Sequence, residues 1–298
     1  MFINIADKSS APYCADQSNR TLNLDLQSNP DIQLEAKMKV LITGARGVLG
    51  RRVLAALPKF VDDIEIIEFR GDLTQPNDVR HNLKDTKHLD AVIHLAAVVS
   101  VPEADANPGH AFAVNVAGTV NLLSALQNSG LMPYFLYASS AHIYKPVKGP
   151  ISEKSPKKPI SLYGHTKWIG EQIAAQMCEL AGQTFCAPRI FSLWDEEQKP
   201  PYLFGAMKKR FSEEDLSKPF FVHSAGSLRD FSSASQIADV ICRLLIRRIA
   251  GPINVGSGQA TEIGEFVQSI APRPLHLSTN SEKTELIADI SRLSKVLS

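Results

Sequence analysis

Three glycines spaced three residues apart follow an apolar run near the start of the chain, and they restrict how this region can fold. Residues 38–43 (MKVLIT) are typical of a strand, and Gly44, Gly47 and Gly50 follow where a helix is expected to begin. A helix N-terminus carries unpaired N–H groups and a partial positive charge, so it can hold a pyrophosphate. Glycine allows the close approach that this needs, because it has no side chain. The alternative interpretation is a tight turn that packs the helix on the strand.

Short apolar runs alternate with helical stretches beyond this loop, which is the pattern of β-α-β units and a parallel sheet. Strands are expected at residues 39–43, 64–69, 90–97 and 134–140. Helices are expected at residues 48–60, 77–85, 110–130, 163–182, 202–211, 234–249 and 262–270. The pattern predicts a Rossmann-type α/β fold, with a doubly wound parallel sheet and a small C-terminal α/β substrate-binding cap.

Composition and pattern divide the chain into three parts. Residues 1–37 are rich in Ser, Asn, Asp and Gln and lack the features of a secretory signal, so they predict a mobile leader. The other interpretation is a start site placed too far upstream, because Met38 begins the first strand. Residues 38–188 are expected to form an NAD(P)-binding Rossmann domain. Residues 189–298 are expected to form a smaller substrate-binding region, whose chain can cross back into the first domain.

Charge and cysteine usage exclude several classes of partner. The formal net charge of +1 gives no electrostatic reason to expect nucleic acid or an anionic membrane surface. The four cysteines include no C-x-x-C pair, so neither a zinc site nor a disulfide framework is expected. No apolar stretch approaches the roughly 20 residues that a membrane helix needs. We therefore expect a cytoplasmic protein with no metal, nucleic acid or membrane partner.

A tyrosine and a lysine four residues apart form a candidate acid–base pair. Tyr163 and Lys167 share one face of an expected helix. A free phenol titrates near pKa ~10, and a neighbouring ammonium group helps to lower that value toward neutrality. Such a pair on an ordinary amphipathic surface is the alternative interpretation. Its position after a strand that ends in Ser139 and Ser140 favours catalysis, because the carboxyl end of the strand would present Ser140 to a substrate.

Together, these elements resemble the extended short-chain dehydrogenase/reductase family, specifically its NAD(P)-dependent nucleotide-sugar epimerase, dehydratase and reductase branch. The resemblance runs from about Met38 to the C-terminus. It is specific as a set, because the motifs occur in family order at family-like intervals. These motifs are T-G-x-x-G-x-x-G at 43–50, Gly71-Asp72-Leu73, His94-Leu95-Ala96-Ala97, Asn115 in NVAGT, Ser139-Ser140, Tyr163-x-x-x-Lys167, Arg229-Asp230-Phe231 and NVGSG at 254–258.

The resemblance implies roles for the residues at the reaction centre. Tyr163 would exchange a proton with a sugar hydroxyl or ketone. Lys167 would lower the pKa of Tyr163 and hold the nicotinamide ribose. Ser140 would hydrogen-bond the reacting oxygen, and Asn115 would brace the active-site strand and helix.

The resemblance also implies how the cofactor is bound. Asp72 and Leu73 would lie by the adenine, and Ala96 and Ala97 by the phosphates and ribose. The implied cofactor-binding residues are Gly44, Arg46, Gly47, Val48, Leu49, Gly50, Glu68, Arg70, Asp72, Leu73, Ala96, Ala97, Asn115, Tyr163 and Lys167.

In the substrate region the resemblance is weaker. Arg229 matches the family's diphosphate-binding arginine, and its alternative role is a surface ion pair with Asp230. The family often has R-x-x-N-x-Y-G-P at the start of this region, whereas residues 189–197 read RIFSLWDEE. Ser192 therefore stands where an asparagine often binds the nucleotide-sugar phosphates, which leaves the substrate geometry there open.

Two arginines indicate which cofactor is used. The resemblance to compact 4-keto-6-deoxy-sugar reductases, in which the third strand is missing or fused with the second, implies that Arg46 and Arg70 clasp the 2′-phosphate of NADP. A planar guanidinium suits a phosphate well. Glu68 favours NAD, because an acid there binds the adenosine ribose hydroxyls. We expect NADP(H) in preference to NAD(H); in the alternative, both arginines are solvated surface residues.

The family implies a nucleotide-sugar substrate, and the C-terminal segment favours reduction of a 4-keto-(6-deoxy)hexose. A 4-epimerase with tightly bound NAD is the second hypothesis, and a non-catalytic NADP-binding subunit is the third. The family also implies a homodimer, formed through the helices near 110–128 and 163–181.

Overall fold

A parallel sheet forms the centre of the computed structural model, which describes residues 37–280 and 282–298. The predicted leader at 1–37 lies outside the described residues except for Lys37. The strands run in the order β2-β1-β3-β4-β7-β12, with β5 beside β7. They are β1 (Met38–Thr43), β2 (Ile64–Glu68), β3 (Ala91–His94), β4 (Tyr134–Tyr137), β5 (Ser139–Ser140), β7 (Phe185–Ile190) and β12 (Gly251–Val255). Because the order reverses at β1, a crevice is expected at the carboxyl ends of β1 and β3.

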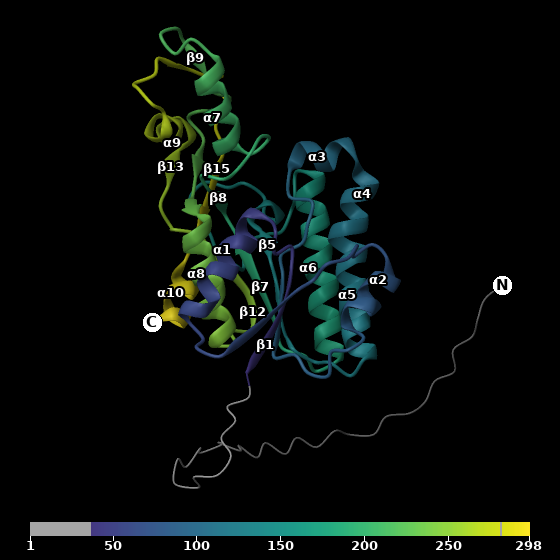
Figure 1. Cartoon of the computed structure of the whole chain (residues 1–298). Coiled ribbons are helices and arrows are strands. Elements are labelled where there is room, and N and C mark those ends of the chain that lie inside the picture. Colours follow the sequence, from purple (N-terminus) through teal and green to yellow (C-terminus); the bar gives the residue numbers. More distant parts are fainter. Residues whose placement is uncertain (1–36, 281) are drawn as a thin grey trace, which may run out of the picture. The chain divides into compact units, whose positions relative to one another are not determined.

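Helices cover both faces of the sheet, as Figure 1 shows. On one face lie α1 (Val48–Ala56) and α8 (Ala234–Ile246). On the other lie α2 (Pro76–Leu83), α5 (Gly118–Asn128) and α6 (Leu162–Leu180). This arrangement confirms the predicted Rossmann-type, doubly wound fold.

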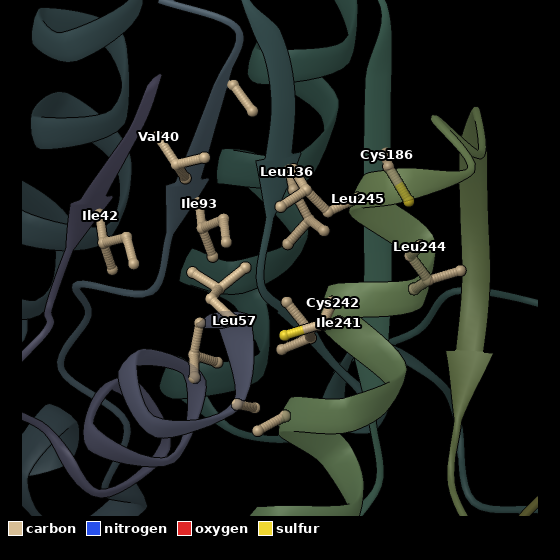
Figure 2. Close-up of a cluster of buried hydrophobic side chains, with 14 of the residues drawn as sticks. Val40, Ile42, Leu57, Ile93, Leu136, Cys186, Ile241, Cys242, Leu244 and Leu245 are labelled. Atoms are coloured by element: carbon tan, nitrogen blue, oxygen red, sulfur yellow. The ribbon is translucent and has the colours of Figure 1, made fainter. Parts of the chain in front are cut away.

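Alternate residues of each central strand pack into opposite helix layers. Val40 and Ile42 face the layer of α1 and α8, where Figure 2 shows them near Ile93 and Leu136. Leu41, between them, packs in the layer of α2, α5 and α6. Strands buried on both faces need apolar side chains at every position, which explains the continuous apolar runs in the sequence.

The central sheet and its helices include segments from beyond residue 188, where the first domain was expected to end. β12 pairs with β7 in parallel from Gly251 to Val255, and α8 packs in the same core as α1. Part of the segment beyond residue 188 is therefore built into the Rossmann layers. β2 pairs only with β1 among the described strands, so the described sheet has no further strand outside β2.

Small sheets and short helices make up the rest of the described chain. One sheet has the order β13-β10-β15-β6, and two further pairs are β11-β8 and β14-β9. The strands are β6 (Pro150–Ile151), β8 (Ser192–Trp194), β9 (Phe220–Phe221), β10 (Leu228–Arg229), β11 (Phe231–Ser233), β13 (Thr261–Glu262), β14 (Leu277–Ser278) and β15 (Glu285–Ala288). The helices are η1 (Leu57–Lys59), α3 (Val101–Ala106), α4 (Pro108–Phe112), η2 (Ala113–Ala117), η3 (Ala141–Ile143), α7 (Leu203–Glu213), α9 (Ile263–Ile270) and α10 (Ser291–Leu297).

Replacing Gly44 by Ala should destabilise the protein by roughly 2 kcal/mol or more. Gly44 has φ +70°, and a Cβ there would lie 2.6 Å from the backbone nitrogen of Ala96. Urea unfolding measures the loss. Gly109→Ala is the matched control, because a Cβ at Gly109 meets nothing within 4 Å. Equal stability of Gly44→Ala and the parent protein would contradict this packing.

Candidate active site

The glycine loop forms one wall of a pocket at the carboxyl end of β1. Gly47 is the N-cap of α1, and no side chain caps that helix. The first N–H groups of α1 are therefore available to an anion. The pocket has a volume of about 480 Å³. Its lining residues are Gly44, Ala45, Arg46, Gly47, Phe69, Arg70 and Gly71. The predicted cofactor residues Val48 and Leu49 lie in the first turn of the same helix.

The structure brings the two predicted phosphate-binding arginines to this one pocket. Both side chains are exposed, and Arg46 makes no ion pair with another described residue. The Arg70 guanidinium lies 3.7 Å from the carboxylate of Glu68 at the end of β2. Glycine backbone, a helix N-terminus and two guanidinium groups together fit the phosphates of a dinucleotide.

A buried hydrogen-bond chain links the glycine loop to the helix layer. The ring nitrogens of His94 bond to the hydroxyls of Thr43 (2.6 Å) and Thr119 (2.9 Å). Thr119 donates its own proton to the carbonyl of Asn115, and Ala96 donates its N–H to Thr43. Burial, with the Lys167 charge as a smaller cause, lowers the pKa of His94 to about 3, so the imidazole is neutral.

The residues that follow β2 and β3 take different positions. Ala96 and Ala97 are half-buried just beyond β3. Asp72 is exposed and accepts hydrogen bonds from the backbone and hydroxyl of Thr74, which lower the pKa of its carboxyl group. Leu73 is buried among the side chains of α2 and α5. Its side chain therefore belongs to the core, while Asp72 stays accessible.

Ser140 and Tyr163 meet at the predicted reaction centre. Ser140 ends β5, and Tyr163 lies in the first turn of α6. Burial raises the pKa of Tyr163 to about 12, and a hydrogen bond with Ser140 opposes that rise. Tyr163 therefore keeps its proton at neutral pH in this structure. Two hydroxyls that lie close together at the carboxyl edge of the sheet can bind one substrate oxygen between them.

Lys167 shares a helical face with Tyr163, and its expected effect on the pKa of Tyr163 stays a prediction. Its ammonium group lies 4.2 Å from the ring centroid of Tyr137. Burial lowers the pKa of Lys167 to about 7, while the Glu171 charge acts in the opposite direction. Lys167 is therefore only partly charged near neutrality in this structure.

Asn115 braces the site from a π-helical turn, η2, that interrupts the single helix expected at 110–130. Its side-chain amide donates to Val98 and Thr166 and accepts from the backbone N–H of Val98. Val98 lies in the segment after β3, and Thr166 lies in α6. Asn115 therefore joins that segment to the catalytic helix, and its buried amide is occupied by protein rather than open to a cofactor.

A buried ion pair that the sequence analysis did not predict underlies the reaction centre. Arg189 in β7 binds Glu171 in α6 at 2.6 Å, and both side chains are buried. Glu171 also accepts a hydrogen bond from the hydroxyl of Ser139. Arg189 donates to the hydroxyl of Tyr144 at 2.7 Å. The spacing of Tyr163, Lys167 and Glu171 at four-residue intervals is the sequence signal that could have indicated this residue.

The predicted substrate residues are partly occupied by protein contacts. Arg229 in β10 donates to backbone carbonyls and to the hydroxyl of Thr284. Asp230 does not pair with it. Instead, Asp230 is buried and accepts from the backbone N–H groups of Ser257 and Gly258, so the proposed surface ion pair is absent from the described contacts. Ser192 is half-buried at the start of β8.

The acidic run after β8 has a structural explanation. Arg52 of α1 binds Asp195 through two hydrogen bonds of 2.8 and 2.9 Å. Arg51 binds Glu197 at 2.8 Å and donates to the backbone carbonyl of Arg46 at 2.6 Å. This departure from the family motif thus fastens the substrate region to the glycine loop.

The comparisons with known proteins agree with this geometry. The sequence profile of the NAD dependent epimerase/dehydratase family matches residues 40–256, which is most of the described chain. The chain belongs to this family. Membership confirms the resemblance to extended short-chain dehydrogenases/reductases, and the pocket at α1 fits the NAD(P) cofactor that the family uses.

Individual members of the epimerase/dehydratase family are related to this chain at moderate identity. GDP-6-deoxy-D-mannose reductase of Pseudomonas aeruginosa is 28% identical over 78% of this chain and 79% of its own length. UDP-glucose 4-epimerase of Lactobacillus helveticus is 33% identical over 52% of each chain. A solved structure of RMD from Pseudomonas aeruginosa complexed with NADPH superposes with a TM-score of 0.79 and 26% identity, covering 88% of this chain and 92% of that one.

No helix among the described residues is long and apolar enough to cross a membrane. Within the same residues, no group of three or more His, Cys, Asp or Glu side chains could hold a metal ion.

Replacing Lys167 by Met should stabilise the protein at and below pH 7. In the folded state the pKa of Lys167 is about 7, whereas in an unfolded chain it is ~10.4. Between these values the unfolded chain binds a proton that the folded protein lacks, so the parent protein gains stability as the pH rises through this window. The advantage of Lys167→Met should be on the order of 1–3 kcal/mol at pH 7 and should shrink toward pH 10.

Urea unfolding between pH 6 and pH 9.5 measures this difference. Lys145→Met is the matched control, because Lys145 is exposed, and it should change stability little at any of these pH values. A stabilisation by Lys167→Met that does not vary with pH would contradict the lowered pKa.

Proposed function

We propose that the protein is an NADPH-dependent reductase of a nucleotide-activated 4-keto-6-deoxyhexose. The observation that carries the proposal is the pairing of Ser140 with a protonated Tyr163 at the carboxyl edge of a sheet whose glycine loop fits a dinucleotide. The similarity to GDP-6-deoxy-D-mannose reductase supports the choice of reaction. A proton donor that keeps its proton at neutral pH suits reduction of a ketone.

The chain's own residues would hold the substrate and control the proton. The bound cofactor supplies the hydride. Ser140 would hold the ketone oxygen and stabilise the negative charge that develops on it. Tyr163 would donate its proton to that oxygen, and Lys167, with a pKa near neutrality, would hold the nicotinamide ribose beside it. Arg229 and Ser192 are the proposed contacts of the substrate's phosphates.

The preference for NADP(H) over NAD(H) is also proposed, on the basis of the pocket beside the glycine loop. Arg46 and Arg70 both line it. Two guanidinium groups can bind a 2′-phosphate dianion by charge-assisted hydrogen bonds. The Glu68 carboxylate lies 3.7 Å from the Arg70 guanidinium, and as an acid at the end of β2 it is the feature that favours NAD.

Replacing Arg46 or Arg70 by Ala should raise the Kd for NADPH by roughly ten- to a hundredfold. The Kd for NADH should change by less than about threefold, because NADH has no 2′-phosphate. Quenching of protein fluorescence measures both constants. Arg80→Ala is the control, because it removes an exposed arginine of α2 that does not line the pocket. An equal rise in Kd for NADPH and NADH would contradict the proposal and would indicate that both arginines are solvated surface residues.

A 4-epimerase is the second candidate function, and the similarity to UDP-glucose 4-epimerase favours it. Such an enzyme must keep NAD bound, because the hydride that leaves the sugar has to return to it. Stoichiometric NAD retained through dialysis, with interconversion of sugar epimers and no net cofactor oxidation, would replace the reductase proposal with this one.

Tyr163→Phe separates catalysis from a non-catalytic NADP-binding role. It removes the proton donor and keeps the buried ring, so turnover should fall by at least about a hundredfold. NADPH affinity should fall far less than turnover, because the substitution leaves the arginine-lined pocket unchanged. If cellular function survives this substitution unchanged, the protein acts as a cofactor-binding subunit instead.

Self-association of two copies of the chain through α5 and α6 is also a proposal.

A further inference from the structure

His142 lies beside the predicted reaction centre and has no role in the mechanism above. It belongs to η3, the short turn that follows Ser140. Its imidazole meets the ring of Tyr163 edge-on, with ring centroids 5.5 Å apart. The side chain is nevertheless exposed. A polar ring therefore contacts the proposed proton donor and still faces solvent.

The backbone holds His142 rigidly against the catalytic helix. Its N–H donates to the hydroxyl of Ser140 at 3.2 Å. A Cβ on Gly164, the neighbour of Tyr163, would lie only 2.3 Å from the carbonyl oxygen of His142. Glycine at position 164 thus allows η3 and the first turn of α6 to pack backbone against backbone. Tyr144, just beyond η3, is anchored by Arg189, so the backbone of η3 is held on both sides of His142.

The imidazole is available for hydrogen bonding. Neither ring nitrogen of His142 bonds to another residue in the described part of the chain. The surrounding protein displaces much of its hydration and lowers its pKa, and the nearby Arg229 charge lowers it further. A neutral imidazole offers one donor and one acceptor. The charged and titratable groups around it are Tyr163 of α6 and Arg229 of β10.

We propose that His142 is a specificity-determining contact that hydrogen-bonds the C3 hydroxyl of the sugar. The inference rests on the proposed reduction at C4. Ser140 and Tyr163 fix the C4 oxygen, so substituents of the neighbouring carbons must lie beside these two residues. In a 4-keto-6-deoxyhexose C5 carries no hydroxyl, and C3 therefore provides the hydroxyl adjacent to the ketone. The His142 ring contacts Tyr163 and its backbone N–H bonds to Ser140, so its side chain lies beside that position.

A comparison of two substrates in four proteins tests the contact. The substrates are a 4-keto-6-deoxy nucleotide sugar and its 3-deoxy counterpart, and kcat/KM is measured with NADPH. The proteins are the parent, His142→Phe, His142→Asn and His165→Phe. The Phe variant keeps an aromatic ring against Tyr163 but has no hydrogen-bonding group, whereas Asn retains one. His165 is an exposed histidine of α6 outside this contact, so its variant is the matched control.

The parent should prefer the 3-hydroxy substrate about tenfold or more, since the deoxy sugar leaves the imidazole unpaired. His142→Phe should reduce that preference to within about twofold, His142→Asn should retain part of it, and His165→Phe should retain all of it. The Kd for NADPH should stay within about twofold in all four proteins, which excludes a general disturbance of the site. Thermal unfolding checks that each variant is folded. If His142→Phe does not fold, the substrate preference of His142→Asn is compared with that of the parent protein instead.

Two results would overturn the contact. One is a parent protein without preference between the substrates; the other is a folded His142→Phe that keeps the full preference while reducing both sugars. In either case NADPH-dependent reduction by the parent would leave the proposed function standing. If none of the tested 4-keto-6-deoxy nucleotide sugars supported NADPH oxidation by the parent protein, the proposed function would be wrong. The proposed contact with His142 would then be wrong as well.

Discussion

The buried pair of Glu171 and Arg189 is the interaction on which the rest of the site depends. Two charges removed from water need close partners and further hydrogen bonds, otherwise their desolvation is strongly unfavourable. Here Glu171 accepts hydrogen bonds from the Arg189 guanidinium and from the hydroxyl of Ser139. Arg189 also donates to the hydroxyl of Tyr144. The pair thus fixes α6 against β7 at one geometry, and removing either partner would leave a buried charge uncompensated.

The position of this pair explains why it matters for chemistry. Glu171 lies one turn beyond Lys167, which itself follows Tyr163 by one turn. Ser139 directly precedes Ser140 in β5. The contact between Glu171 and Ser139 therefore sets the catalytic helix against the strand that carries the oxygen-binding serine. Tyr144 extends the network by donating to Asn254 of β12 at 2.8 Å, so the strand that crosses back from the C-terminal part is fastened to the same centre.

A second buried chain performs a comparable task at the cofactor end. Neutral His94 joins Thr43, which ends β1, to Thr119 of α5. Thr119 in turn bonds the carbonyl of Asn115, whose amide holds α6. The glycine loop and the catalytic helix are therefore connected through hydrogen bonds with no charged member. Such networks specify a single arrangement because each polar group has few alternatives when buried.

Sequence reasoning predicted the features that depend on local pattern. The glycine loop, strands β1 to β4 and the Tyr163–Lys167 face follow from residue spacing, and the structure contains each of them, whereas β7 and β12 of the same sheet were not predicted. It missed Glu171 and Arg189, because a buried ion pair joins residues distant in sequence whose burial only the tertiary structure reveals. The tertiary structure also places the Lys167 ammonium over the ring of Tyr137, a contact that residue spacing alone does not reveal.

Transfer of deuterium tests the central claim most directly. The protein would be incubated with a 4-keto-6-deoxy nucleotide sugar and NADPH deuterated at the transferring position of the nicotinamide, and the product would be examined by NMR. We expect one deuterium at C4 of a 4-hydroxy product, together with stoichiometric NADP⁺. Recovery of the 4-keto sugar without deuterium at C4 and without oxidation of NADPH would contradict this claim.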